Sequence, residues 1–326
     1  MTTYYPFPIE IFLEIAEILN INERINLMRA IPPLQSRIPH RWIITPDATD
    51  RAAREAGSTM LHVLANNGDA KLLNTLLTPN TMNADLRNGA KRTPLSIACE
   101  MGHLAVIQLL CERAEVNVNS GDSTRRTPLS WAAGEGHSHA VRYLIERDDV
   151  LIDRADSWCQ TPLMWAVQGG HESVVQGLLA QENIWGLASS LVEEDRALLR
   201  MDLVGINTED ESGRTPLLAA VYNGDPTMVK LLLTRGDVDV TRKYGNDRRT
   251  VLSVACEMGH LEIVRMLFDR GGLELDEVER DSKNPMIWAS LCGHMDVVAF
   301  LASRGADPGD FARFMQRREE LWSDST

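Results

Sequence analysis

The sequence predicts an all-α solenoid, a stack of short helix pairs, and three observations carry this prediction. A short motif recurs along most of the chain with a nearly constant period. Each copy carries residues that begin a helix at one end and glycine that ends it at the other. A second segment with apolar residues at helical spacing follows each copy. Neither helix can bury its apolar face alone, whereas at least three stacked copies can.

The motif is clearest in residues 126–137, which read Arg-Thr-Pro-Leu-Ser-Trp-Ala-Ala-Gly-Glu-Gly-His. Its Thr position recurs every 34 or 35 residues, except for one step of 54 residues. The positions are Thr59, Thr93, Thr127, Thr161, Thr215, Thr250 and Asn284. The sequence therefore predicts about seven repeats, with an insertion at about 181–203.

Each copy predicts two helices. The Thr hydroxyl can accept a hydrogen bond from the first turn, and Pro at the first helical position loses no bond. In the clearest copy the first helix is expected from Pro128 to about Gly134–Gly136, where glycine can adopt the left-handed conformation. The second is expected over 138–145, with its apolar face formed by Ala140, Val141, Leu144 and Ile145.

These repeated motifs resemble the ankyrin repeat family over roughly residues 55 to 310. The motifs pair Thr93-Pro94-Leu95 with Gly102-His103, and they recur in register along the chain. The family usually has His after Thr-Pro-Leu, and here only His62 keeps it. The replacements are Ser96, Ser130, Met164, Leu218, Ser253 and Ile287. These copies are expected to lose a buried polar bridge between repeats.

Residues 1–50 do not fit the period. They predict an amphipathic helix with Phe12, Ile15, Ala16 and Leu19 on one face, then a second helix over 22–30 that ends before Pro32-Pro33. The segment resembles the start of an F-box, which implies binding to a Skp-type adaptor of a cullin–RING ubiquitin ligase. The expected adaptor-binding residues are Pro8, Ile11, Ile15, Leu19 and Leu27. The alternative is a helical cap on the open end of the solenoid.

Three domains are therefore expected: an F-box-like domain at 1–50, ankyrin repeats at 51–310 and a C-terminal capping helix at 311–326. Residues 47–56 are expected to be a connecting helix or linker. Within the insertion, Ser190 and Glu193 form a capping-box pattern that predicts an extra helix over 191–200. The insertion is interpreted as a surface loop that arose by sequence drift and has no function of its own. The alternative is a partner contact through Trp185 or the acidic run 193–195.

The amino-acid composition disfavours several classes of partner and site. The net charge of −13 disfavours a nucleic-acid partner, because such binding depends on Lys and Arg replacing counterions. Five cysteines without a Cys-x-x-Cys spacing predict neither a disulfide framework nor a zinc ribbon. No membrane partner is expected, since no signal-peptide pattern and no run of about 18 to 20 apolar residues occurs. The expected location is cytoplasmic and/or nuclear.

No catalytic, cofactor or metal site is predicted. Most histidines fall at one repeat position after Gly, so the period explains them, and successive copies about 10 Å apart cannot share a metal. No phosphate-binding, nucleophile-elbow or zinc-protease motif is present. A small-molecule enzyme that uses a groove beside Trp185 remains the least favoured alternative.

Two repeated side-chain positions are interpreted as structural. Trp131, Trp165 and Trp288 share one register position and are predicted to pack in the core. A basic residue directly precedes the cap position in five copies, and this column is predicted to be a solvated edge, with complementarity to an acidic partner as the alternative. The column comprises Arg92, Arg126, Arg214, Arg249 and Lys283.

A protein partner is expected on the concave face, where this family varies: the turn tips and the end of each first helix. The predicted protein-binding residues are Trp158, Tyr222, Met258, Glu100, Met101, Glu135, Gln168, Asn223 and Glu257. We hypothesise an apolar centre of Trp158, Tyr222 and Met258 with Glu100, Glu135 and Glu257 as an acidic rim. The predicted function is a non-catalytic substrate receptor for a cullin–RING ligase. The alternative is a plain scaffold or inhibitor without a ubiquitin link.

Overall fold

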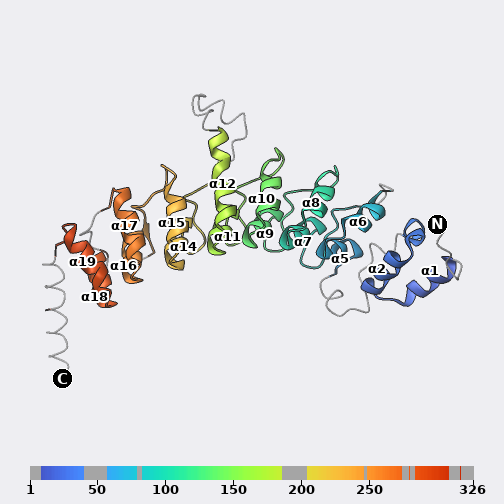
Figure 1. Ribbon diagram of the computed structural model, residues 1–326, viewed down its shortest axis with the longest axis horizontal. Helices are drawn as coiled ribbons and strands as arrows, with labels where there is room; N and C mark the ends of the chain where they lie inside the picture. The colour runs from blue at the N-terminus through green and yellow to red at the C-terminus, as the bar shows by residue number, and fades with distance from the viewer. Residues whose placement is uncertain are drawn as a thin grey trace, which may run out of the picture. The chain divides into compact units, whose positions relative to one another are not determined.

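The computed structural model describes residues 9–39, 57–78, 83–185, 204–245, 248–273, 279, 283–307 and 316. The chain divides into two compact units, whose helices are labelled in Figure 1. Unit 1 comprises Met1–Ser157 with Gly177–Asp202, and unit 2 comprises Trp158–Gln176 with Leu203–Thr326. Several expected features lie outside the described residues. They are the linker over 47–56, the capping box at 190–193, the helix over 191–200 and, apart from Gln316, the C-terminal helix.

Within the described ranges, a pair of helices follows each motif position. The pairs of unit 1 are α5 (Met60–Asn67) with α6 (Ala70–Leu77), α7 (Pro94–Met101) with α8 (Leu104–Cys111), and α9 (Pro128–Gly134) with α10 (Ser138–Ile145). Those of unit 2 are α14 (Pro216–Asn223) with α15 (Pro226–Leu233), α16 (Val251–Glu257) with α17 (Leu261–Arg270), and α18 (Pro285–Leu291) with α19 (Met295–Ser303). Helix α11 (Pro162–Gln168) of unit 2 precedes α12 (Glu172–Trp185), which continues into the region of the predicted insertion.

The local signals act as the sequence predicts. The Thr93 hydroxyl accepts a hydrogen bond of 3.2 Å from the Ser96 N–H, which caps the first turn of α7. Gly102 follows α7 with φ of 71°, in the left-handed region that glycine enters without strain. The apolar face predicted for α10 is buried throughout. Stacking these faces gives each unit a continuous core, and in unit 1 this core contains Leu61, Leu95 and Leu129 at one repeat position.

A short β-hairpin, with two residues in each strand, lies between α15 and α16 in unit 2. Strand β1 (Lys243–Tyr244) pairs antiparallel with β2 (Arg249–Thr250), so Tyr244 faces Arg249. Extended residues before a Thr cap can pair in this way because the cap itself has β conformation. This short hairpin was not predicted from the sequence.

The N-terminal helices are α1 (Ile9–Ile18) and α2 (Ile21–Ala30), followed by a 3₁₀ helix, η1 (Pro32–Arg37). Asn20 and Glu23 form a capping box at the start of α2. The proline pair that ends α2 also begins η1, because proline suits the first turn of a helix. Helix α2 contacts α5 and η1 contacts α6, so this segment covers the first helix pair of unit 1.

The cysteines are all free and fall into two groups. Cys99, Cys111 and Cys256 are buried, whereas Cys159 and Cys292 are exposed. Burial raises the pKa of the Cys99 and Cys256 thiols well above their usual value, and it raises the pKa of Cys111 to about 12.

Candidate protein-binding face and the clusters beside it

Four apolar residues predicted for the binding face are exposed. The exposed fractions are 40% for Met101 in unit 1 and 45%, 42% and 40% for Trp158, Tyr222 and Met258 in unit 2. Met101 and Tyr222 lie in the last turns of α7 and α14, Met258 directly follows α16, and Trp158 lies in the turn before α11. Exposed apolar side chains of this size favour contact with a partner.

The polar residues predicted for this face differ in their exposure to solvent. Glu135 and Asn223 are exposed, whereas Glu100, Gln168 and Glu257 are half-buried. The Asn223 amide lies 3.4 Å from the main-chain carbonyl oxygens of both Val167 and Gln168. That these residues act together with the apolar ones in binding stays a prediction.

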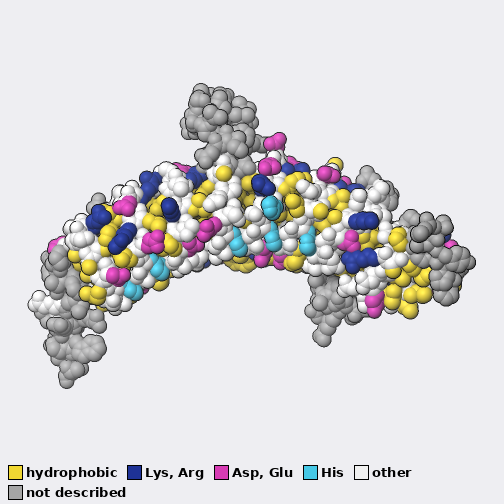
Figure 2. All heavy atoms as spheres, in the orientation of Figure 1, with side chains coloured by type: hydrophobic (Ala, Val, Ile, Leu, Met, Phe, Trp, Pro, Cys, Tyr) yellow, Lys and Arg dark blue, Asp and Glu magenta, His cyan; other side chains and the backbone are white. Residues whose placement is uncertain are grey.

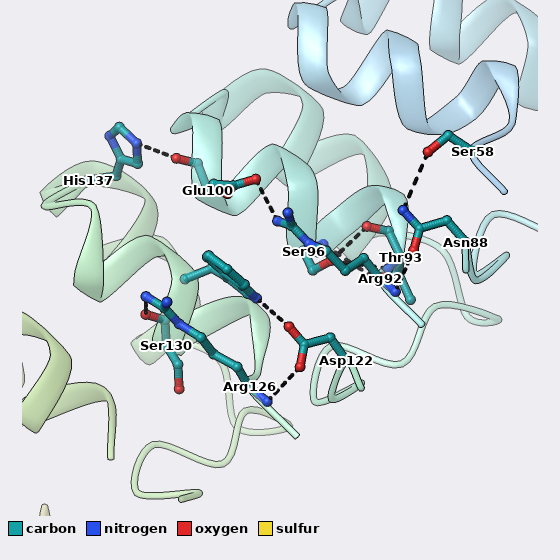
Figure 3. A network of polar contacts seen from close by, with 11 residues as sticks. Ser58, Asn88, Arg92, Thr93, Ser96, Glu100, Asp122, Arg126, Ser130 and His137 are labelled. Atoms are coloured by element: carbon teal, nitrogen blue, oxygen red, sulfur yellow. Dashed lines mark hydrogen bonds and ion pairs between the residues drawn. The ribbon is translucent and has the colours of Figure 1, made fainter. Parts of the chain in front are cut away.

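A cluster of charged side chains and one indole lies in unit 1 and includes Glu100, the residue before Met101 (Figure 3). We call it the Trp131 cluster, and it consists of Arg92, Glu100, Asp122, Arg126 and Trp131. The two guanidinium carbons lie 4.2 Å (Arg92) and 3.8 Å (Arg126) from the centre of the Trp131 ring. Arg92 Nη2 donates to Glu100 Oε2 over 2.6 Å, and the indole N–H donates to Asp122 Oδ2 over 3.1 Å. Cations on an aromatic face are attracted to its negative potential.

Asp122 also shapes the turn that leads into α9. Its Oδ1 accepts hydrogen bonds from the main-chain N–H groups of Thr124 and Arg126, an arrangement typical of Asx turns. Arg125 sits between them with φ of 66°. The Arg126 side chain is buried, and burial lowers its pKa, while Glu135, Asp156 and Asp122 act in the opposite direction. The cluster therefore holds a cation inside unit 1 by surrounding it with carboxylates.

Unit 2 contains a matching set, the Trp288 cluster of Arg249, Glu257, Glu279, Lys283 and Trp288. The Arg249 guanidinium carbon and Lys283 Nζ each lie 4.2 Å from the centre of the Trp288 ring. Arg249 Nη2 donates to Glu257 Oε2 over 2.7 Å, and the indole N–H donates to Glu279 Oε2 over 2.7 Å. The same four kinds of contact therefore occur in both units.

The prediction that the three Trp residues pack in the core is wrong. Trp131, Trp165 and Trp288 are half-buried, and two of them are stacked against cations. The prediction of a solvated basic edge is wrong for Arg126, which is buried, and for Arg92 and Arg249, which are largely enclosed in ion pairs. An indole N–H needs a partner when it is enclosed, so the ring lies at the boundary where carboxylates can reach it.

Two of the three glutamates of the hypothesised acidic rim are not free charges in the structure. Glu100 and Glu257 each form an ion pair with an arginine, so most of their charge is balanced from within the same repeat. Glu135 is exposed and contributes an outward-facing negative charge in unit 1. A partner would meet paired carboxylates beside each methionine.

The histidines after glycine link successive repeats. His103 Nε2 lies 2.9 Å from the Asn66 carbonyl oxygen, and His137 Nε2 lies 2.7 Å from the Glu100 carbonyl oxygen. Figure 2 shows histidine side chains on the visible face of both units. Among the residues that the structure describes, no three His, Cys, Asp or Glu side chains come close enough to hold a metal ion.

The single Thr-x-x-His motif forms the bridge that the sequence predicts. His62 Nδ1 bonds to the Thr59 cap, and Nε2 lies 3.0 Å from the Arg92 carbonyl oxygen in the next repeat. Among the described residues, the Ser96 side chain instead bonds to Thr93 of its own repeat. In unit 2 the Tyr244 hydroxyl lies 2.9 Å from the Thr215 hydroxyl and provides a link from the next turn.

Acidification is expected to weaken unit 1 through His62. Burial lowers its pKa from 6.5 to about 4, so between these pH values the unfolded chain binds the proton that the folded chain excludes. Stability should therefore be complete above pH 6.5 and fall toward pH 4, by about 2 kcal/mol at pH 5. Urea denaturation at pH 7 and pH 5 measures this. His62→Ser, which installs the residue found in other copies, should reduce the pH dependence; an unchanged dependence would contradict the assignment.

Sequence reasoning missed Asp122 and Glu279. Both lie five residues before the cap of the next helix, at a position that is also acidic or Asn in other repeats, as Asn88, Asp156 and Asp210. An acidic residue at this position together with Trp four residues after the cap is the pattern that would have indicated the clusters.

The N-terminal candidates divide by exposure. Ile11 and Ile15 are 38% and 40% exposed, and Ile18 is 79% exposed. Ala16 of α1 is buried, whereas Ile15, predicted on the same apolar face, is exposed. Leu19 and Leu27 are half-buried. Pro8 lies outside the described residues, and so does the Trp185 side chain on which the enzyme alternative depends.

Comparison with known families agrees with this geometry. A model described as ankyrin repeats (3 copies) matches residues 40–122, 114–187, 154–244, 187–276 and 237–312. These matches overlap and extend over most of the chain. The chain belongs to the ankyrin repeat family.

Its curated ankyrin relatives match over limited segments. Ankyrin repeat domain-containing protein 63 of Mus musculus is 41% identical over 101 residues, which are 29% of this chain and 25% of that protein. Transient receptor potential cation channel subfamily A member 1 of Drosophila melanogaster is 30% identical over 118 residues, 35% of this chain and 10% of that protein. The chain thus matches about a quarter or less of the length of these relatives.

Solved ankyrin domains share the fold. The ankyrin repeat domain of Bcl-3 has a TM-score of 0.60 and 23% identity, covering 75% of this chain and all of that chain. The human ASB11 ankyrin repeat domain has a TM-score of 0.59 and 24% identity, covering 77% of this chain and all of that chain. No ankyrin helix within the described residues is long and apolar enough to span a membrane.

Proposed function

We propose that this ankyrin chain is a non-catalytic scaffold that binds a protein partner at the ends of its first helices and at the adjoining turns. The observation that carries the proposal is the exposure of Trp158, Tyr222, Met258 and Met101 at positions where the fold does not require apolar side chains. Large apolar and aromatic side chains dominate binding energies at protein interfaces. The family supports the proposal, because ankyrin repeats generally bind proteins.

The state of the reactive side chains favours binding over catalysis. Glu100 and Glu257 are neutralised by arginines, and the buried thiols have raised pKa values that suppress the nucleophilic thiolate. The matched family is one of interaction modules. A cytoplasmic or nuclear location is part of the proposal.

Substituting the aromatic residues of unit 2 should weaken partner binding. Trp158→Ala and Tyr222→Ala are each expected to reduce affinity by at least about tenfold, because truncating a central interface residue commonly costs more than 1 kcal/mol. Partners are captured with the full chain, identified by mass spectrometry and then measured individually by calorimetry. Met295→Ala is the control, since Met295 is 61% exposed on the second helix α19. Equal binding by both aromatic variants would show that the partner uses another surface.

A second element of the proposal concerns the N-terminus. We propose that α1 docks a Skp-type adaptor, so that the scaffold delivers its partner to a cullin–RING ligase. The support is a stripe of exposed side chains, Ile11, Ile15 and Ile18, at the i, i+4, i+7 spacing of one helix face. A simple cap would not need this stripe, because α2 and η1 already contact the first helix pair.

The adaptor proposal can be tested with point substitutions, so that the N-terminal helices still cover the first helix pair. Full-length chain carrying Ile11→Glu and Ile15→Glu should lose the adaptor and cullin from a pull-down while retaining the ankyrin partner, because only the exposed stripe changes. Glu14→Gln on the same helix is the matched control. If the wild-type chain recovers no adaptor, residues 1–50 act as a cap and the chain is a plain scaffold or inhibitor.

A further inference from the structure

One surface of this chain occurs twice. Residues 92–104 and 249–261 have the same sequence except at two positions, where Pro94 and Ile97 are replaced by Val251 and Val254. The first copy belongs to unit 1 and the second to unit 2. Identity at buried positions such as Cys99 is expected from packing, but the copies also agree at positions that face solvent.

The exposed methionines are the clearest of these positions. Met101 and Met258 are each 40% exposed, and each directly precedes the glycine that follows the first helix. The fold does not demand methionine there. Other repeats carry Asn67, Glu135, Gly169, Asn223 and Cys292 at the same position.

The surroundings of the two methionines are also the same. Each is preceded by a glutamate paired to an arginine, at 2.6 Å for Arg92 and 2.7 Å for Arg249. Each arginine stacks on a tryptophan of the next repeat at 4.2 Å. Helix α14 carries Ala219 at the Trp position, and the repeat before it has Gln168-Gly169 in place of the Glu-Met pair.

We propose that these surfaces are two copies of one subsite, and that each binds an extended basic peptide segment with a large apolar side chain against the methionine. We call them the Met101 subsite and the Met258 subsite. This inference rests on the proposed protein-binding function and specifies the chemical class of the segment that the partner presents. One partner carrying the segment twice, or two partner molecules, would occupy them.

Charge favours a basic segment. The cationic side chains next to the subsites stack on indole rings or pair with carboxylates, and Arg126 is buried. Glu135 is exposed at the position equivalent to Met101 in the next repeat, and the chain has a net charge of −13. Lysine or arginine in a partner would therefore approach without displacing an exposed cation. Methionine adapts its shape to different apolar partners, which suits a subsite used twice.

The experiment isolates each subsite in the full chain. Met258→Glu leaves only the Met101 subsite, and Met101→Glu leaves only the Met258 subsite. Each variant is used to select binders from a phage-displayed library of short random peptides. Both selections should yield one motif, with basic residues around a large apolar residue. A synthetic peptide of that motif should bind wild type with two peptides per chain, either single variant with one, and the double variant with none.

Controls and contrary outcomes are defined by the same measurements. Met295→Glu and Leu151→Glu alter exposed apolar residues elsewhere in units 2 and 1, and should retain two peptides per chain. Two different motifs, one peptide per wild-type chain, or no enriched motif would overturn the inference. The scaffold proposal would survive these outcomes if protein partners still depended on Trp158 and Tyr222.

Discussion

Replacing Trp131 with alanine is expected to lower the free energy of unfolding of unit 1 by about 3 kcal/mol. The ring lies between Arg92 and Arg126, and its N–H satisfies Asp122. Its removal would leave the buried Arg126 without its aromatic cover and Asp122 without one of its donors. Loss of packing around an enclosed cation adds to the loss of the indole surface. Urea denaturation followed by circular dichroism measures the change.

Trp131→Phe separates the two contributions. Phenylalanine keeps a ring between the arginines but has no N–H, so its expected cost is about 1 kcal/mol, the value of one hydrogen bond. Trp288→Ala should show a comparable loss in unit 2, where Arg249 and Lys283 flank the ring. If Trp131→Ala changed stability by less than about 0.5 kcal/mol, as exposed surface residues do, the cluster would have no structural role.

The second large effect is expected at Gly259. Its φ is 73°, and a Cβ atom there would lie 2.4 Å from Nδ1 of the His294 ring. Gly259→Ala should cost about 3 kcal/mol, because a left-handed alanine is strained and the ring must also move from its place between repeats. Gly293 provides the matched control, since it has the same place after α18 and φ of 81°, but none of the described residues has an atom within 4 Å of the added Cβ. Gly293→Ala should cost only about 1 kcal/mol.

A double variant tests the cause. Gly259→Ala combined with His294→Ala should be less unstable than the sum of the single variants, because the second change removes the clashing ring. Thermal unfolding of all four proteins provides the comparison. Additive effects would mean that the backbone strain alone accounts for the loss.

The sequence predicted the helix pairs well because their signals are local. The Thr cap, the proline after it and the glycine after the first helix act within a few residues of one another, so reading the period is enough to place α7 and α10. The hairpin at Tyr244 was missed because two-residue strands leave no alternating pattern to detect.

The clusters were missed for a different reason. Ile97 and Val254 occupy the Trp position in neighbouring repeats and are buried, so the pattern favours the core for Trp131 as well. Its arginine partner, Arg92, belongs to the preceding repeat, and whether the two side chains stack depends on orientation between repeats. Periodicity predicts which positions are equivalent, but it does not predict which of them share ions.

The distribution of the cysteines gives the two units separate chemical reporters. Cys99 in unit 1 and Cys256 in unit 2 are equivalent positions of the duplicated segment, and both thiols are buried. A maleimide can reach them only when the surrounding repeats open, whereas Cys159 and Cys292 are accessible in the folded chain. After the exposed thiols are blocked, the order in which Cys99 and Cys256 become alkylated reports which unit of the native protein opens first.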